Sequence, residues 1–225
     1  MIRNMKKNRI FELADAIQVK EGSVVSQNLA RRPDMELALY SFGDGESITT
    51  QHSFGDVFYY VIGGKAEFAL GETSMTGESG TALLVPHQDP HAVKACGGMQ
   101  LLYMQVMKKG DDIMYINNFV QNEVVDLASQ VEYEKGKIVS KSLVQRDSMT
   151  LTLFAFDAGE GVSTHASQGD AMVVVLDGTA EITVDGVTRT ASKGQSIIMP
   201  AGIPHAVTAV TPYKMLLIVV FPGGK

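Results

Sequence analysis

Two short stretches in the second half of the chain decide its fold. Residues 159–178 read GEGVSTHASQGDAMVVVLDG, and residues 194–205 read GQSIIMPAGIPH. In both stretches glycine or proline flanks an apolar run, Met172–Leu176 or Ile197–Met199, and each stretch carries one histidine, His165 or His205. Because glycine and proline interrupt strands and form turns, these stretches predict short strands joined by tight connections.

The same framework of glycine and proline occurs a second time, 114 residues earlier in the chain. A tandem duplication explains this match, because a repeat at a fixed spacing is the signature of repeated structural units. We therefore predict an N-terminal domain over residues 1–107, a linker over 108–121 and a C-terminal domain over 122–225. The matched positions include Gly45 and Gly159, Gly55-Asp56 and Gly169-Asp170, Gly64 and Gly178, and Pro90-His91-Ala92-Val93 and Pro204-His205-Ala206-Val207.

The composition excludes several classes of function. The 225 residues are 45% hydrophobic with a formal net charge of -6, and the basic residues are scattered, so a nucleic-acid partner is not expected. The single cysteine, Cys96, allows neither an internal disulfide framework nor a cysteine-based zinc site. No signal peptide follows the basic start, and the longest apolar run, Met215–Phe221, has the length of a strand. We expect a cytoplasmic protein with no membrane partner.

The predicted secondary structure is almost entirely β-strand. Apolar residues at helical spacing predict a short amphipathic helix at the start of each half, over residues 11–17 and 124–131. Asp185-Gly186, between two β-branched runs, predicts a type I′ hairpin turn. The strands predicted in the second half are residues 149–156, 172–176, 180–184, 187–191, 196–199, 205–210 and 213–220.

The two quoted stretches resemble the two signature motifs of the cupin superfamily. The spacing Gly-X5-His-X-(His)-X3-(Glu)-X6-Gly fits residues 159–178, and Gly-X5-Pro-X-Gly-X2-His-X3-(Asn) fits residues 194–209, with Ala209 in place of the asparagine. With a copy in each half, the chain looks like a bicupin. The resemblance implies an all-β fold of two tandem cupin barrels of the RmlC-like jelly-roll type, each preceded by a short helix. Because cupins include many kinds of enzyme and also binding proteins, the fold implies no single activity.

In cupins that bind a metal, two histidines and a glutamate of the first motif and the histidine of the second motif hold the ion. Carried onto this sequence, the four positions of the C-terminal half are His165, Ser167, Ala171 and His205. The four positions of the N-terminal half are Gln51, Ser53, Val57 and His91. Catalytic metal sites usually offer three protein ligands, so His165 and His205 are candidate ligands in an incomplete set, and the N-terminal site is degenerate.

Neighbouring residues offer substitutes for the missing ligands. Asp170 lies one residue before the glutamate position and is read either as a turn residue whose carboxylate accepts backbone N–H groups or as a metal ligand. Gln168 has the reach to bind a small molecule in the pocket by a hydrogen bond. His52 has the opposite strand parity from Gln51 and is expected to face outward, whereas His87 is placed near the pocket rim.

Strand parity also predicts the walls of the two pockets. Ala171, Val173, Val207 and one of Phe154 and Phe156 are expected inside the C-terminal barrel. The equivalent residues of the N-terminal barrel are bulkier, which predicts that its own side chains partly fill it. The N-terminal set comprises Tyr40, Phe42, Val57, Tyr59 and Val93.

Two functional hypotheses follow, and neither assigns a catalytic residue. In the first, the protein binds a small molecule and carries a divalent metal (iron, manganese, nickel or zinc) on His165 and His205 of the C-terminal barrel. In the second, it is a non-enzymatic binding or sensor protein without a metal. In both, the ligand pocket comprises His165, Ser167, Gln168, Ala171 and His205, with Gln51 and His91 in its N-terminal twin. The duplicated chain is expected to be a monomeric pseudo-dimer or a homodimer.

Overall fold

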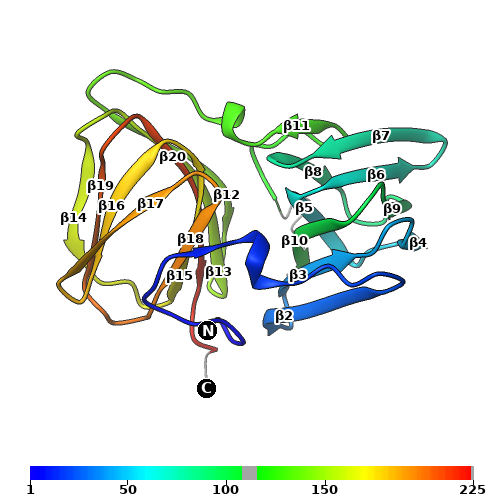
Figure 1. Ribbon diagram of the computed structural model, residues 1–225, viewed down its shortest axis with the longest axis horizontal. Coiled ribbons are helices and arrows are strands. Elements are labelled where there is room, and N and C mark those ends of the chain that lie inside the picture. The colour runs from blue at the N-terminus through cyan, green and yellow to red at the C-terminus, as the bar shows by residue number, and fades with distance from the viewer. Residues whose placement is uncertain (108–115, 224–225) are drawn as a thin grey trace. The chain divides into compact units, whose positions relative to one another are not determined.

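The computed structural model describes residues 1–107 and 116–223, and these residues are mostly in β-strands (Figure 1). They divide into two compact units. Residues 14–127 form one unit, and residues 1–13 together with residues 128–225 form the other. We call these units the N-terminal barrel and the C-terminal barrel.

The C-terminal barrel consists of two antiparallel sheets that enclose a shared core, as in a jelly roll. One sheet has the order β1-β18-β15-β20-β13-β12 and the other has the order β14-β19-β16-β17. The strands of this barrel are β1 (Phe11–Glu12), β12 (Ile138–Gln145), β13 (Met149–Phe156), β14 (Gly161–His165), β15 (Asp170–Asp177), β16 (Thr179–Val184), β17 (Val187–Ser192), β18 (Gln195–Met199), β19 (His205–Ala209) and β20 (Tyr213–Val220).

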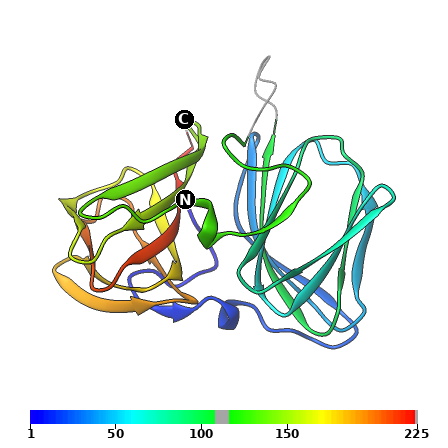
Figure 2. The same cartoon turned by 90° about the horizontal axis from the view of Figure 1, so that it is seen from above.

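The N-terminal barrel repeats this topology (Figure 2). Its sheets have the orders β11-β8-β5-β10-β3-β2 and β4-β9-β6-β7. The strands are β2 (Val24–Arg32), β3 (Met35–Phe42), β4 (Ser47–Gln51), β5 (Gly55–Gly63), β6 (Lys65–Leu70), β7 (Thr73–Glu78), β8 (Thr81–Val85), β9 (His91–Ala95), β10 (Met99–Met107) and β11 (Val124–Asp126).

The seven strands predicted in the second half are confirmed, with ends that differ by up to two residues. Asp185 and Gly186 both have positive φ, 52° and 73°, as a type I′ turn requires. The prediction missed β12 and β14. Both strands are largely exposed or half-buried, so their sequences carry few apolar residues to mark them.

The prediction of a short amphipathic helix at the start of each half is wrong. None of the residues that the structure describes is α-helical, and the two segments form β1 and β11 followed by single 3₁₀ turns, η1 (Ala14–Ala16) and η2 (Ala128–Gln130). Each segment supplies backbone hydrogen bonds to a sheet edge, such as those from Leu13 N to Gly194 O and from Leu127 N to Gly80 O. These bonds to the sheet edge hold each segment in an extended conformation. A segment this short does not form a stable α-helix by itself.

The first strand of each repeat belongs to the barrel of the other repeat. The N-terminal segment, dark blue in Figure 1, lies beside β18, where Phe11 pairs with Ser196. In the same way, Val124 of β11 pairs with Leu83 of β8. The domain boundaries expected from the sequence, 1–107 and 122–225, differ from the structure at this point, because pairing to a distant sheet edge leaves no local signal. Residues 108–115 of the expected linker lie outside the described residues.

Each barrel has its own apolar core. The C-terminal core gathers Phe156, Val173, Ile182, Ile197 and Tyr213, and the N-terminal core gathers Phe42, Tyr59, Phe68, Leu83 and Leu101. Residues of both sheets contribute to each core, so burial of apolar surface holds the sheets together. No helix in the described part of the chain is long and apolar enough to cross a membrane.

Replacing Gly178 with alanine is expected to destabilise the C-terminal barrel by roughly 3 kcal/mol. Gly178 has a φ of +71°, and a Cβ atom there would lie 1.8 Å from the carbonyl oxygen of Pro212, so the backbone must shift. Gly186→Ala is the matched control, because its φ is +73° with nothing within 4 Å of the added atom. The control should lose only about 1 kcal/mol, the cost of the left-handed conformation. Equal losses in denaturant unfolding would contradict this assignment.

Candidate functional site

Two histidines face each other on neighbouring strands of the C-terminal barrel. His165 ends β14, His205 begins β19, and the two residues are direct partners in the antiparallel register. Their rings are 4.5 Å apart between centroids and inclined by 62°. The two motifs quoted from the sequence therefore meet at one point, as the strand pairing of a jelly roll requires.

The hydrogen bonds of both imidazoles fix which nitrogen carries the proton. Nδ1 of His165 lies 2.9 Å from the carbonyl oxygen of Ser163, and Nδ1 of His205 lies 2.9 Å from that of Ile203. A carbonyl oxygen can only accept, so Nδ1 donates in both rings. In the neutral form of each ring, Nε2 is then left with a free lone pair.

The two histidines differ in their exposure. The His205 side chain is buried, whereas His165 is exposed and lies at the edge of the site. Burial lowers the pKa of His205 below its ordinary value of 6.5; the hydrogen bond to Ile203 O opposes this shift, and the neighbouring His165 adds to it. His205 is therefore a neutral acceptor at pH 7.

A cavity of about 280 Å³ opens beside the two rings. Eight apolar side chains and one serine complete its wall, so the polar groups are confined to a small part of an otherwise hydrophobic pocket. The cavity is lined by Phe154, Val162, His165, Ser167, Ala171, Met199, His205, Val207, Met215, Leu217 and Val219.

Most of the pocket residues named from the C-terminal sequence line this cavity. They are His165, Ser167, Ala171 and His205, together with Phe154 and Val207 from the parity argument. Gln168 is placed elsewhere, in an open surface depression with Arg146 and Phe221. Val173 and Phe156 lie in the packed core. Parity identifies which face a residue occupies, but the depth of packing decides whether it meets a core or a cavity.

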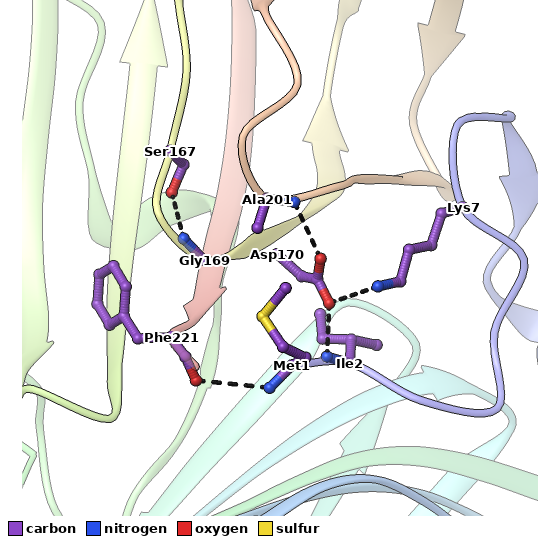
Figure 3. Close-up of polar contacts among 8 residues, drawn as sticks. All are labelled: Met1, Ile2, Lys7, Ser167, Gly169, Asp170, Ala201 and Phe221. Carbon is purple, nitrogen blue, oxygen red and sulfur yellow. Dashed lines mark hydrogen bonds and ion pairs between the residues drawn. The ribbon is translucent and has the colours of Figure 1, made fainter. Parts of the chain in front are cut away.

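Asp170 begins β15, and its carboxylate accepts backbone N–H groups, as its interpretation as a turn residue expected. Its carboxylate is fully buried and accepts hydrogen bonds from Ile2 N, Lys7 Nζ and Ala201 N (Figure 3). Two of the three donors, Ile2 N and Lys7 Nζ, come from the N-terminal segment, which the strand exchange brings to this position. The local pattern around Asp170 does not reveal these partners.

The donor set does not fit a resident catalytic metal. Nowhere in residues 1–107 and 116–223 do three histidine, cysteine, aspartate or glutamate side chains cluster as a metal site would require. Ala171 has no donor atom, and Ser167 Oγ accepts a hydrogen bond from Gly169 N. Two imidazoles remain, one fewer protein ligand than catalytic zinc sites usually have.

The side chains at the equivalent site of the N-terminal barrel hydrogen-bond to one another. Nε2 of His91 lies 3.1 Å from the hydroxyl of Tyr59, which also bonds to Gln51. Since Nδ1 of His91 donates to the carbonyl oxygen of Asp89, Nε2 must accept from Tyr59. The Tyr59 ring makes edge contacts with His91 and Tyr103, and burial raises its pKa well above the usual range.

Three tyrosines account for the difference between the two barrels. Tyr40, Tyr59 and Tyr103 occupy the positions that Phe154, Val173 and Leu217 hold in the C-terminal repeat, 114 residues later. The bulkier N-terminal set was expected to fill this barrel in part. That set omitted Tyr103, whose ring contacts those of Tyr40 and Tyr59. The repeat alignment would have shown Tyr103 opposite Leu217. His52 is exposed, as its parity predicts, with Nδ1 3.0 Å from the carbonyl oxygen of Gln88.

Comparison with known proteins identifies the family. The family model of the Cupin domain (Cupin_2) matches residues 152–221. A Cupin 2 conserved barrel domain protein from Leptotrichia buccalis, of solved structure, is 30% identical and superposes with a TM-score of 0.82, over 98% of this chain and 99% of that chain. The chain belongs to the cupin superfamily.

More distant cupin-like structures share the fold alone. Protein Ylba from E. coli is 14% identical, with a TM-score of 0.61 over 96% of this chain and 92% of that chain. A salicylate 1,2-dioxygenase from Pseudaminobacter salicylatoxidans is 12% identical, with a TM-score of 0.60 over 87% of this chain and 76% of that chain. No curated protein matches this cupin. The function must therefore be argued from the site.

The stability of this cupin is expected to fall as the pH falls through about 6.5. Burial lowers the pKa of both His91 and His205 in the folded state. The unfolded chain then binds protons at a higher pH than the folded chain does. The two histidines therefore contribute fully to the free energy of unfolding above the unfolded pKa, and this contribution is lost as the pH falls toward the folded pKa. NMR titration of the imidazole Cε1 protons, with urea unfolding at pH 7.5 and 5.5, checks both parts. Titration of both rings at or above 6.5 would refute it.

Removing one buried tyrosine hydroxyl is expected to destabilise the N-terminal barrel but not the C-terminal barrel. Tyr59→Phe takes the donor from the buried Nε2 of His91 and should cost about 1–2 kcal/mol. Tyr213→Phe should be neutral or stabilising, because the buried Tyr213 hydroxyl has no hydrogen-bond partner among the described residues. The two variants lose the same atom from equally buried rings. A comparable loss of unfolding free energy in both would refute the role given to Tyr59.

Proposed function

We propose that the C-terminal barrel of this cupin binds a small molecule with an apolar body and a head group that donates a hydrogen bond. The cavity beside His165 and His205 carries this proposal. It combines a mainly hydrophobic wall with two imidazole nitrogens that face no protein donor in the described hydrogen bonds. Pockets that bind small ligands have this composition, with few polar groups to orient the ligand.

The volume and the wall define the body of the ligand. A cavity of about 280 Å³ lies at the lower end of the range for small-molecule pockets. Phe154, Met199 and Met215 offer flat or adaptable apolar surface, and no charged side chain lines the cavity. These features favour a single-ring or short-chain compound over a highly charged metabolite.

The histidines define the head group. With Nδ1 donating to the backbone, each neutral ring offers Nε2 as an acceptor, so a hydroxyl or an amine N–H on the ligand is the complementary group. Ser167 Oγ already accepts from Gly169 N and can turn its own hydrogen toward a ligand. A carboxylate would instead place its lone pairs against those of the two imidazoles.

A divalent metal on the same two histidines is the rival proposal. It draws on one observation, the pair of Nδ1–carbonyl bonds, because metal-binding histidines are commonly oriented in this way. Iron, manganese, nickel or zinc would find only two protein ligands there. We therefore favour hydrogen-bonded ligand binding over metal-dependent catalysis.

Binding of 4-ethylphenol, measured by calorimetry and NMR in the presence of EDTA, tests the proposal. We expect it to bind at least about tenfold more tightly at pH 7.5 than ethylbenzene or 4-ethylbenzoate, since one well-placed hydrogen bond is worth about that factor. His165→Gln, which installs the residue of the N-terminal site, should remove this preference. His52→Gln, a change at an exposed histidine of the other barrel, is the matched control.

Two results would overturn the proposal. Equal affinity for the three compounds would show that the histidines do not select the head group. Tight binding of one equivalent of an added divalent metal, abolished by His165→Gln but not by His52→Gln, would support the metal site instead. Elemental analysis of protein purified without an affinity tag decides this second point.

A further inference from the structure

The buried carboxylate of Asp170 lies where three separate parts of the C-terminal barrel meet. Asp170 is the first residue of β15 and precedes Ala171, which lines the cavity. One carboxylate oxygen accepts from Ala201 N at 3.0 Å. The other accepts from Ile2 N at 2.8 Å and from Lys7 Nζ at 2.6 Å, as Figure 3 shows. Residues far apart in the chain thus depend on one charged group.

Because the buried carboxylate of Asp170 carries a charge, the loss of its partner Lys7 is expected to destabilise the contacts around it. Asp170 is completely buried, whereas the Lys7 side chain is 31% exposed. A buried carboxylate is stable only when its charge and its lone pairs are compensated, so removal of the lysine leaves an uncompensated charge inside the barrel. Lys7 belongs to the exchanged N-terminal segment that carries β1. The docking of this segment and the burial of the Asp170 carboxylate therefore support each other.

A short series of bonds connects Asp170 to His205. Ala201, which donates to Asp170, lies in the loop between β18 and β19, and Gly202 N donates to Ser167 O at 2.8 Å. The next residue, Ile203, supplies the carbonyl oxygen that accepts from Nδ1 of His205. The loop that Asp170 anchors is therefore the loop that orients the buried histidine.

The N-terminal barrel repeats the backbone part of this arrangement. Asp56 accepts from His87 N at 2.9 Å and from Ile116 N at 3.0 Å, the positions equivalent to Ala201 and Ile2. The residue equivalent to Lys7 is Gln121, which is neutral. The lysine partner accordingly belongs to the barrel whose cavity is lined by His165 and His205, while the N-terminal barrel has an uncharged residue at that position.

We propose that Asp170 is a positioning residue that couples docking of the exchanged segment, through Lys7, to the orientation of His205 in the ligand cavity. Asp170 acts through the 200–204 loop and does not line the cavity itself. Its effect on ligand affinity rests on the proposed function. Its effect on the loop and on the imidazole does not depend on any ligand.

The decisive variant is Lys7→Met, which retains the apolar stem and removes the charge. Without ligand, we expect hydrogen exchange at the Gly202 amide to accelerate by about tenfold relative to the Ile182 amide of the same barrel, which corrects for global unfolding. The ¹⁵N shifts of the His205 ring should also change. Lys7→Arg should restore both signals, because its guanidinium keeps the ion pair. Asp56→Asn, the matched change in the other barrel, should leave both unaltered.

With 4-ethylphenol as the probe, Lys7→Met should weaken binding by about threefold to tenfold, and Asp170→Asn by at least as much. A variant that lowers only the unfolding temperature, with Gly202 exchange, His205 shifts and affinity as in the wild type, would overturn the proposal. If Lys7→Met alters Gly202 exchange and the His205 ring shifts but the wild-type protein does not bind 4-ethylphenol, the positioning role is upheld and the proposed function is refuted. If Asp170→Asn does not fold, Lys7→Met alone provides the test.

Discussion

Two buried carboxylates, Asp56 and Asp170, hold together the ends of this cupin's two barrels. Each accepts backbone N–H groups from an exchanged segment and from the loop before the motif-two histidine. A carboxylate removed from water is costly unless it is fully hydrogen-bonded, so the segments that supply its donors are held in place. The same carboxylates thus connect the segments that carry β1 and β11 to the loops that precede His205 and His91.

The two barrels place different side chains at equivalent inward positions of one topology. Tyr59 brings a ring and a hydroxyl to the position that Val173 occupies in the other repeat, and that hydroxyl satisfies Nε2 of His91. In the C-terminal barrel no such group lies between the two imidazoles and the apolar wall in the described contacts. A few inward side chains therefore distinguish the two sites.

The surviving site is better suited to hydrogen bonding than to metal coordination. Ser167 and Ala171 stand at positions where the family motif has a histidine and a glutamate, which leaves two imidazoles as strong donors of lone pairs. Both rings are oriented by backbone carbonyls, and the buried ring is kept neutral by its surroundings. Such a pair recognises a hydroxyl or an amine without the charge and geometry that a metal imposes.

Much of this architecture could be predicted from the sequence. Glycine and proline spacing, the 114-residue repeat and the alternation of apolar residues determined the duplicated all-β fold, most strands and six of the cavity residues, because these features depend on local backbone preferences and strand parity. Only the tertiary structure decided that β1 and β11 exchange barrels, that Asp170 meets Lys7, and that Gln168 lies outside the cavity. These outcomes depend on pairing between residues that are distant in the chain, such as Lys7 and Asp170, and on the depth of packing, neither of which leaves a periodic mark in the sequence.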